Sequence, residues 1–154
     1  MLNSVLTKDH ERIDAYLNDF FLSLSSKPDM NKLSLIVSSL KNHMFWEEEY
    51  LFPEIFEENK LRIKSLEAEH GAILKLLEEV KRLISINELE DAKEKIQAVM
   101  RVLKGHNESE EGYIYFELDK FESQKQAYLL LKEVEHAAAP KDWICTVLRT
   151  GSSK

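Results

Sequence analysis

Residues 43–55 read HMFWEEEYLFPEI, and residues 106–118 read HNESEEGYIYFEL. Both stretches contain a His, a Glu four residues after it and another Glu directly following, then a Tyr, two large apolar residues, a Glu and an aliphatic residue. A shorter pair precedes them, because LTKDHERI at 6–13 is echoed by LEAEHGAI at 66–73. The pattern indicates one two-helix unit used twice, and a repeat of this kind constrains the architecture of the whole chain.

The composition is typical of one soluble, helical domain. With 154 residues, the chain is long enough for a single sizeable core. Only 4 glycines and 3 prolines are present, which favours helices over a loop-rich or all-β fold. The formal net charge of −7, with no cluster of Lys or Arg, argues against a nucleic-acid partner.

Cysteine content and hydropathy bear on the compartment. Cys145 is the only cysteine, which excludes an internal disulfide framework and is typical of a reducing compartment. No apolar run approaches membrane-spanning length, and the N-terminus lacks the pattern of a signal peptide. We therefore expect a cytoplasmic protein with no membrane partner, and the sequence leaves its oligomeric state open.

Apolar residues recur at alternating steps of three and four along four long segments, as on the inward face of amphipathic helices. These segments are 3–26, 31–52, 61–86 and about 88–118. Pro53 should end the second helix, with 57–60 as a solvated connection. Four helices joined by short connections favour an all-α fold, an antiparallel up-down four-helix bundle.

The remaining residues form a C-terminal extension. A short fifth helix is expected over 122–138, before Pro140. We expect residues 1–121 to form the bundle and residues 122–154 to pack on it or extend from it. The tail around Trp143 would dock on the bundle or on a partner protein.

Each long helix carries one His on its apolar stripe, and these are His10, His43, His70 and His106. Glu47 and Glu110 follow two of them by one helical turn, about 40° away around the helix axis. Unpaired ionisable groups in a bundle core would be costly, and a shared metal removes that cost. Mixed imidazole and carboxylate ligands favour iron, manganese or zinc over calcium or magnesium.

Glu111 is the alternative to Glu110 as the ligand on the fourth helix. On an ideal helix Glu111 lies about 140° from His106, away from the stripe, so we favour Glu110. A π-bulge could bring Glu111 in instead. A single His on an apolar stripe is more often a core residue than a ligand. Four such histidines with two matching glutamates make coincidence a poor explanation, so we predict metal binding.

Other side chains in these motifs have less specific interpretations. Residues expected on solvated faces are Glu48, Glu49, Glu108 and His136. Tyr50 and Tyr113 lie seven residues after a histidine and should point inward, as core aromatics or as hydrogen-bond donors to the carboxylates. Asp9 and Glu69 either orient neighbouring histidines or are exposed.

The motifs resemble those of the hemerythrin-like, or HHE cation-binding, domain over about residues 3–120. The resemblance implies a four-helix bundle that holds a non-heme di-iron centre, with or without an oxo or hydroxo bridge. Carried over to this chain, it implies that Glu47 and Glu110 bridge the irons and that the four histidines are the terminal ligands. Zinc or manganese are the expected substitutes for iron.

Leu74 departs from the pattern of oxygen-carrying hemerythrins, which have a second His at that position. Those proteins also use an acidic residue five, not four, after the last His, where this sequence has Glu111. With two histidines and two bridging oxygens per iron, both irons would keep positions open to small ligands. We therefore expect binding of O2, nitric oxide or peroxide for sensing, detoxification or iron handling, rather than bulk O2 transport or conventional enzyme activity.

Two alternatives come from other functional classes. One is an iron-binding, iron-responsive interaction module without turnover, which would dock through the tail around Trp143. The other is a bundle that holds a structural zinc or no metal at all.

Overall fold

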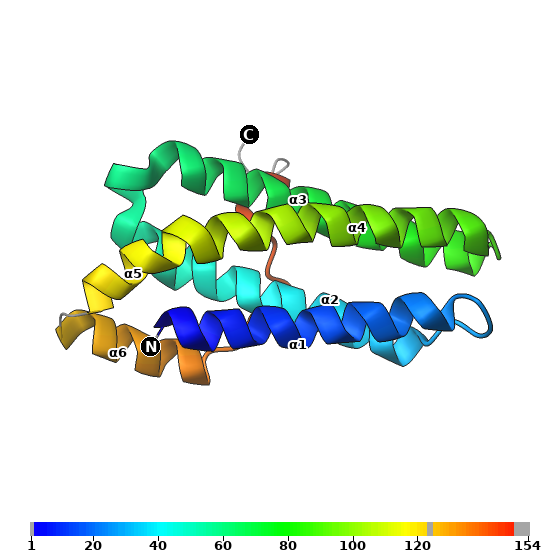
Figure 1. Cartoon of the computed structure of the whole chain (residues 1–154), viewed down its shortest axis with the longest axis horizontal. Coiled ribbons are helices and arrows are strands. Elements are labelled where there is room, and N and C mark those ends of the chain that lie inside the picture. Colours follow the sequence, from blue (N-terminus) through cyan, green and yellow to red (C-terminus); the bar gives the residue numbers. More distant parts are fainter. Residues whose placement is uncertain (1, 123–124, 150–154) are drawn as a thin grey trace.

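The computed structural model describes residues 2–122 and 125–149 and is helical, with no strand among those residues. Four long helices lie side by side (Figure 1). They are α1 (Leu2–Ser23), α2 (Met30–Phe45), α3 (Phe56–Ser85) and α4 (Leu89–Ser109). Turns at one end of the molecule join α1 to α2 and α3 to α4, and the chain passes from α2 to α3 at the opposite end. The predicted all-helical, four-helix architecture is confirmed.

Local sequence explains where the long helices begin and end. Asp29 caps the start of α2, because its carboxylate accepts a hydrogen bond of 3.0 Å from the backbone N–H of Lys32. Between α3 and α4, Asn87 adopts a left-handed backbone conformation with φ of 61°. Asn tolerates this conformation better than most residues, which lets the chain reverse within a few residues.

The sequence repeat ends in the same structural feature twice. α2 continues into the π-helical turn η1 (Trp46–Leu51), and α4 continues into the π-helical turn η3 (Glu110–Ile114). The backbone N–H of Phe52 donates to the carbonyl of Glu47, and that of Tyr115 donates to the carbonyl of Glu110. A π turn closes over five residues, so each aromatic residue shares a face with the glutamate five residues before it. On an α-helix it would lie about 140° away.

The connection between the second and third helices differs from the prediction. α-Helix ends at Phe45, and the short 3-10 helix η2 (Phe52–Ile55) leads directly into α3, so residues 57–60 are helical rather than a solvated connection. Pro53 is accommodated at the start of η2, where its missing N–H leaves no helical hydrogen bond unmade. The remaining kink lies at Asn59, with φ of −135° and ψ of 24°.

Two apolar clusters fill the bundle. The cluster toward the α1–α2 and α3–α4 turns includes Leu17, Phe20, Ile36, Leu77 and Val99. The cluster at the other end includes Leu6, Leu51, Ile63, Ile114 and Leu118. Full burial of one such side chain contributes about 1.5–3 kcal/mol, so these clusters stabilise the bundle independently of the polar groups between them.

The C-terminal extension packs on the bundle through both clusters. It follows α5 (Tyr115–Glu122) and contains α6 (Lys125–His136) and the 3-10 turn η4 (Thr146–Leu148). Leu131 and Val134 are buried in one cluster, and Trp143 and Cys145 in the other. The observed helix ends at His136, before the predicted end at 138. Residues 123–124 and 150–154 of the predicted extension lie outside the described residues.

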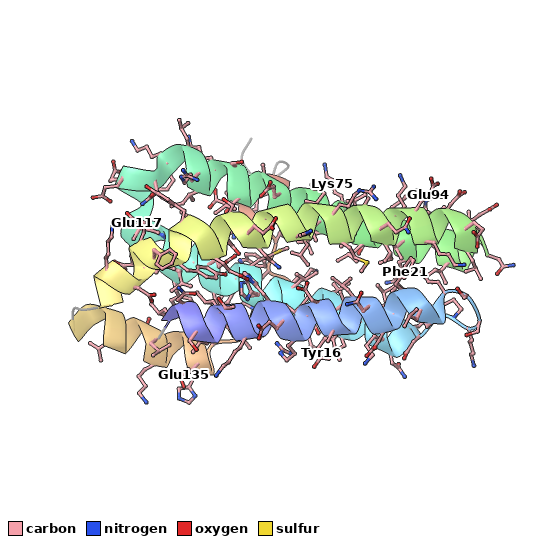
Figure 2. All side chains as sticks on the ribbon, in the orientation of Figure 1. Tyr16, Phe21, Lys75, Glu94, Glu117 and Glu135 are labelled. Atoms are coloured by element: carbon pink, nitrogen blue, oxygen red, sulfur yellow. The ribbon has the colours of Figure 1, made fainter. Side chains whose placement is uncertain are left out.

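Charged side chains cover the outside of the bundle, as Lys75, Glu94 and Glu135 illustrate in Figure 2. In the part of the chain that the structure describes, no helix combines the length and the apolar character needed to cross a membrane.

Candidate metal centre

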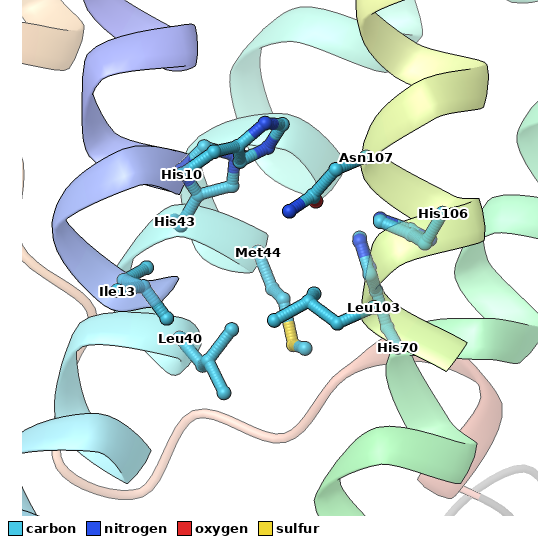
Figure 3. A pocket seen from close by; sticks show the side chains of 9 residues that line it. All are labelled: His10, Ile13, Leu40, His43, Met44, His70, Leu103, His106 and Asn107. Carbon is cyan, nitrogen blue, oxygen red and sulfur yellow. The ribbon is translucent and has the colours of Figure 1, made fainter. Parts of the chain in front are cut away.

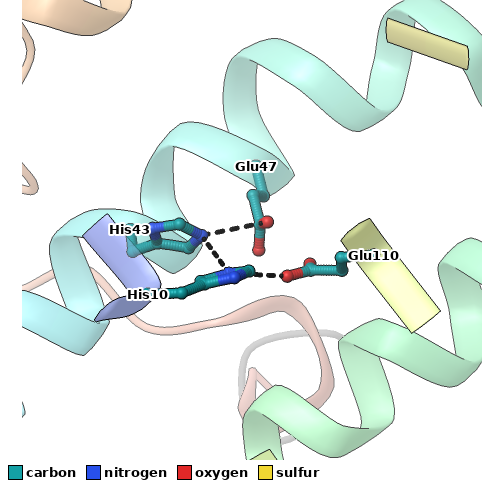
Figure 4. A group of neighbouring side chains, drawn as sticks. All are labelled: His10, His43, Glu47 and Glu110. Carbon is teal, nitrogen blue, oxygen red and sulfur yellow. Dashed lines mark hydrogen bonds and ion pairs between the residues drawn. The ribbon is translucent and has the colours of Figure 1, made fainter. Parts of the chain in front are cut away.

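The four histidines on the apolar stripes meet in one layer of the bundle. Each long helix supplies one of them, none is more than 4% exposed, and Glu47 and Glu110 are fully buried. The histidines are buried because each occupies a position on the inward face of its helix where the three- and four-residue spacing otherwise places an apolar residue. Figure 4 shows His10, His43, Glu47 and Glu110 converging from three segments of the chain.

These four residues form the first of two donor groups. His10 Nε2 lies 3.1 Å from His43 Nε2 and 3.0 Å from Glu110 Oε1. His43 Nε2 lies 3.1 Å from Glu47 Oε2. Neighbouring ligands of a metal at 2.0–2.2 Å are about 3 Å apart, so this spacing fits one metal ion.

The second donor group contains His70 and His106 with the same two glutamates. His70 Nε2 lies 3.1 Å from Glu47 Oε1, and His106 Nε2 lies 3.2 Å from Glu110 Oε2. In each group, one donor atom per residue lies within 4.8 Å of all the others. Each carboxylate therefore offers one oxygen to each group, as a ligand shared by two metals would.

A carboxylate holds the outer nitrogen of every histidine. The Nδ1 distances are 2.7 Å for His10 to Glu111, 2.8 Å for His43 to Asp9, 2.6 Å for His70 to Glu48 and 2.9 Å for His106 to Glu69. The pairing follows the sequence repeat, because each partner is adjacent in sequence to a member of a donor group. When Nδ1–H donates outward, the Nε2 lone pair faces the centre, which is the tautomer that a metal ligand needs.

Glu110 and Glu111 occupy different positions in the structure. Glu110 is fully buried in both donor groups, whereas the side chain of Glu111 is 38% exposed and contacts the outer nitrogen of His10. The alternative in which a π-bulge brings Glu111 to the centre is not observed. The π turn is present, but it begins at Glu110 and changes the position of residues that follow.

Two predictions about neighbouring residues were wrong. Glu48 is buried rather than solvated, because both the backbone N–H and the hydroxyl of Thr146 in the tail donate to its Oε1 at 2.8 Å. Tyr113 is 39% exposed rather than inward, and its ring lies 3.9 Å from the guanidinium carbon of Arg62. The π turn rotates Tyr113 away from the core, and a spacing rule based on the α-helix misses that rotation.

The remaining residues near the motifs either orient histidines or are exposed, as the sequence had suggested. Asp9 and Glu69 orient histidines, although each acts on the histidine of the adjacent helix rather than on its sequence neighbour. The residues that are exposed, as predicted, are Glu49, Glu108 and His136. Glu49 additionally accepts a hydrogen bond of 3.0 Å from the indole of Trp143.

Buried carboxylates raise the pKa of two histidines of the centre. Burial alone would lower the pKa of His43, but Glu47 and the hydrogen bonds to Asp9 and Glu47 raise it to about 10. Burial would also lower the pKa of His106, but the nearby carboxylates of Glu110 and Glu69 outweigh that effect and raise it to about 10. Protons therefore neutralise the buried carboxylates when no metal is bound, and a metal would displace them.

One buried polar atom points more directly to a cation. Among the described residues, Glu110 Oε2 is buried and has no contact with good hydrogen-bond geometry, although it forms an ion pair with protonated His106. It faces His106 Nε2 at 3.2 Å. A buried carboxylate oxygen without a donor is costly, and a metal ion between the oxygen and the nitrogen would remove that cost. The residues present thus fit a metal ion.

A small cavity lies beside the histidine rings (Figure 3). Its lining residues are His10, Ile13, Leu40, His43, Met44, His70, Leu103, His106 and Asn107. Its volume is about 10 Å³, roughly enough for one water molecule. Asn107 is 7% exposed, its Oδ1 has no hydrogen-bond partner among the described residues, and its amide projects between the two pairs of histidines.

Tyr115 is the residue of the centre that sequence reasoning missed. It is fully buried, and its hydroxyl lies between 2.7 and 3.1 Å from a donor atom of each residue in the first group. Burial, together with the carboxylates of Glu110 and Glu47, raises the pKa of Tyr115 well above its usual value. The repeat contains the signal, since Tyr115 is the counterpart of Phe52, but the pattern treats both simply as large apolar residues.

Comparisons with known proteins agree with the resemblance noted in the sequence. Residues 1–118 match the family model described as the hemerythrin HHE cation binding domain. No match was found among curated proteins, and none among solved structures.

Proposed function

Because this chain belongs to the hemerythrin HHE cation-binding domain family, we propose that it holds a non-heme di-iron centre that binds O2, nitric oxide or peroxide. The observation that carries the proposal is the pair of donor groups that share Glu47 and Glu110. In this assignment His10 and His43 would hold one metal, His70 and His106 would hold the other, and both glutamates would be shared by the two metals.

The donor chemistry supports iron. Four imidazole nitrogens and four carboxylate oxygens suit iron, with zinc or manganese as substitutes, and are a poor set for calcium or magnesium. Bound iron supplies the redox chemistry and the open coordination positions with which O2, nitric oxide and peroxide react.

The protein's own side chains orient the ligands and exclude bulk water. Carboxylates at every Nδ1 hold the imidazoles in place, and removing such partners typically weakens metal affinity 10–100-fold. Apolar side chains line part of the cavity beside the histidines, and the Asn107 amide would offer hydrogen bonds to a bound molecule.

The size of the cavity supports a small ligand. A volume of about 10 Å³ is room for about one water molecule and is far below the several hundred Å³ of ordinary organic-ligand pockets, which favours a very small ligand. Leu74, where oxygen carriers have a further His, is 7% exposed and packs in the apolar core, so it supplies no donor. These features support sensing, detoxification or iron handling over bulk O2 transport or conventional catalysis.

The helix order, the domain bounds and the cellular location are parts of the same proposal. We propose the antiparallel up-down order, supported by the turns that join α1 to α2 and α3 to α4 at one end (Figure 1). We propose residues 1–121 as the bundle and 122–154 as a packed extension, supported by the burial of Leu131 and Trp143. The free Cys145 supports a cytoplasmic location.

An iron-responsive interaction module is the second candidate, and one contact favours it. Thr146 in the tail donates twice to Glu48, whose other oxygen contacts Nδ1 of His70. Metal binding at His70 would thus change the position or charge of the Glu48 carboxylate and, through it, the hydrogen bonds that hold Thr146. In that case, metal loading would change the exposure of the tail while small ligands would produce no spectral change.

Metal analysis tests the proposal. We expect ferrous iron added in air to give two irons per chain and charge-transfer absorption. A protein that takes up only zinc, or no metal, with unchanged stability would contradict the di-iron assignment. Adding peroxide or nitric oxide should then change the absorption spectrum if the first candidate holds, and leave it unchanged if the second does.

Asn107 offers a test of the cavity as the ligand position. Asn107→Leu removes the amide, and one net hydrogen bond is worth about 0.5–1.5 kcal/mol, so nitric oxide affinity should fall about 2–10-fold. Asn18→Leu, at an exposed Asn on α1, is the matched control and should leave the affinity unchanged. Equal affinities in wild type and Asn107→Leu would exclude this cavity as the binding position.

A further inference from the structure

We propose that Tyr115 is a metal ligand of the His10–His43 half of the centre, so that the two halves are chemically unequal. The inference rests on the proposed di-iron function and adds a fifth protein donor to one metal position. It starts from four distances. The Tyr115 hydroxyl lies 2.9 Å from His10 Nε2, 3.1 Å from His43 Nε2, 2.7 Å from Glu47 Oε2 and 3.0 Å from Glu110 Oε1.

These distances put the oxygen at the apex of a pyramid. The four donors below it are spaced 3.0–3.1 Å apart along the three edges between His10, His43, Glu47 and Glu110 given above. We take the four donors as the corners of a square with 3.1 Å edges, whose centre is about 2.2 Å from each corner, a usual metal–ligand distance. An atom 2.7–3.1 Å from all four corners of that square lies about 2 Å above its centre. In this arrangement the hydroxyl would be a fifth ligand of a metal at the centre and would not occupy the metal position itself.

The π turn η3 is what brings Tyr115 to this position. Its backbone N–H bonds to the carbonyl of Glu110, five residues earlier, so both side chains reach the same point in the bundle. The ring is fully buried and stacks on His10, with centroids 5.5 Å apart and planes inclined at 27°. A side chain held in this way cannot turn its hydroxyl elsewhere without repacking the core.

The other half of the centre carries Phe52 at the equivalent position. Phe52 follows Glu47 by five residues and closes η1 with the corresponding backbone bond. Its ring stacks on His70, with centroids 6.1 Å apart and planes inclined at 11°. Because Phe has no hydroxyl, the His70–His106 half has four protein donors where the His10–His43 half has five. Small ligands should therefore bind preferentially at the His70–His106 half, which has more open positions.

Spectroscopy of the iron-loaded full chain tests this inference without measuring activity. After ferrous iron has been added in air, we expect resonance Raman modes of a tyrosinate bound to ferric iron, with the corresponding visible absorption. Tyr115→Phe should keep two irons per chain and lose these modes. Phe52→Tyr should gain a second set, and Tyr50→Phe, a tyrosine outside both donor groups, should leave the spectrum unchanged.

The outcomes separate the two proposals. Wild-type protein with two irons and no tyrosinate modes would overturn the Tyr115 assignment alone, as would modes that persist in Tyr115→Phe. Protein that binds no metal would overturn both this inference and the di-iron function. The wild-type spectrum alone shows whether a tyrosinate binds iron, even if a variant fails to fold.

Discussion

At the scale of single residues, the centre depends on which carboxylate oxygen meets which imidazole nitrogen. Glu110 and Glu111 are adjacent in sequence, yet one contributes to both donor groups and the other contacts only the outer nitrogen of His10. The spacing in the sequence indicated the six central side chains, because each lies on the inward face of its own helix, and a four-residue step keeps each glutamate on the same face as its histidine. Their binding of metal stays a prediction. The contacts of Glu48 and Glu111 were beyond reach, since they join segments far apart in sequence.

Glu110→Gln and Glu111→Gln should differ in metal content. Glu110→Gln removes the shared anionic ligand, so we expect loss of the dinuclear iron. Glu111→Gln removes only a partner of His10, so two irons should still bind, with affinity lower by about 10–100-fold. Metal analysis after dialysis against a graded chelator measures both. The reverse order of effects would assign the bridge to Glu111.

Metal-free protein should lose stability in alkaline solution. The pKa of His43 and that of His106 are raised to about 10, from about 6.5 in an unfolded chain. Their stabilising contribution is therefore complete below about pH 6.5 and is lost as pH rises toward 10. Urea midpoints in the presence of chelator should fall over this window, and a His43→Gln/His106→Gln variant should show a smaller fall. Parallel curves for the two proteins would contradict the assigned pKa shifts.

At the scale of elements, the two π turns determine which aromatic side chains face the centre, and α-helical spacing in the sequence did not predict this. Steps of three and four correctly predicted four helices, since most of each helix is regular. The turns η1 and η3 rotate the residues within and after them, which is why Tyr113, inside η3, faces outward and Tyr115, directly after it, faces the centre. Pro53 likewise lies in the first turn of a 3-10 helix and does not end the helical path. Such changes of hydrogen-bond register depend on tertiary packing and have no signature in the spacing of apolar residues.

Gly71 and Gly105 offer a matched pair that tests the docking of the tail on α3. A Cβ on Gly71 would meet the side chain of Val147, whereas nothing lies within 4 Å of a Cβ on Gly105. Gly105→Ala should stabilise the protein by about 0.5–1 kcal/mol, because Ala is the better helix former. Gly71→Ala should displace the tail and change Trp143 fluorescence. An equal gain in stability for both variants, with unchanged fluorescence, would mean that the tail does not pack there.

At the scale of the whole molecule, a polar layer lies between two apolar clusters. One cluster comes from α1, α2, α3 and α4, and the other from α1, α3 and the segments that continue α2 and α4, so the bundle has a hydrophobic core at both ends of the metal centre. This division explains how buried ionisable groups are tolerated. Burying them without a metal is unfavourable, and the two apolar clusters contribute free energy that offsets this cost.

Removing the metal should therefore weaken the fold without abolishing it. We expect chelated protein to keep its helical circular dichroism and to unfold at lower urea concentration than loaded protein. Free metal at 1,000 times its dissociation constant would stabilise the folded state by about 4 kcal/mol. Loss of helical signal on chelation would show that the apolar clusters alone do not hold the bundle.

Anomalous diffraction at the iron edge, from crystals of the loaded protein, most directly tests the shared-carboxylate centre. We expect two iron peaks, one beside His10 and His43 and one beside His70 and His106, with the carboxylates of Glu47 and Glu110 contacting both. A single peak, or peaks that share neither carboxylate, would contradict the dinuclear assignment.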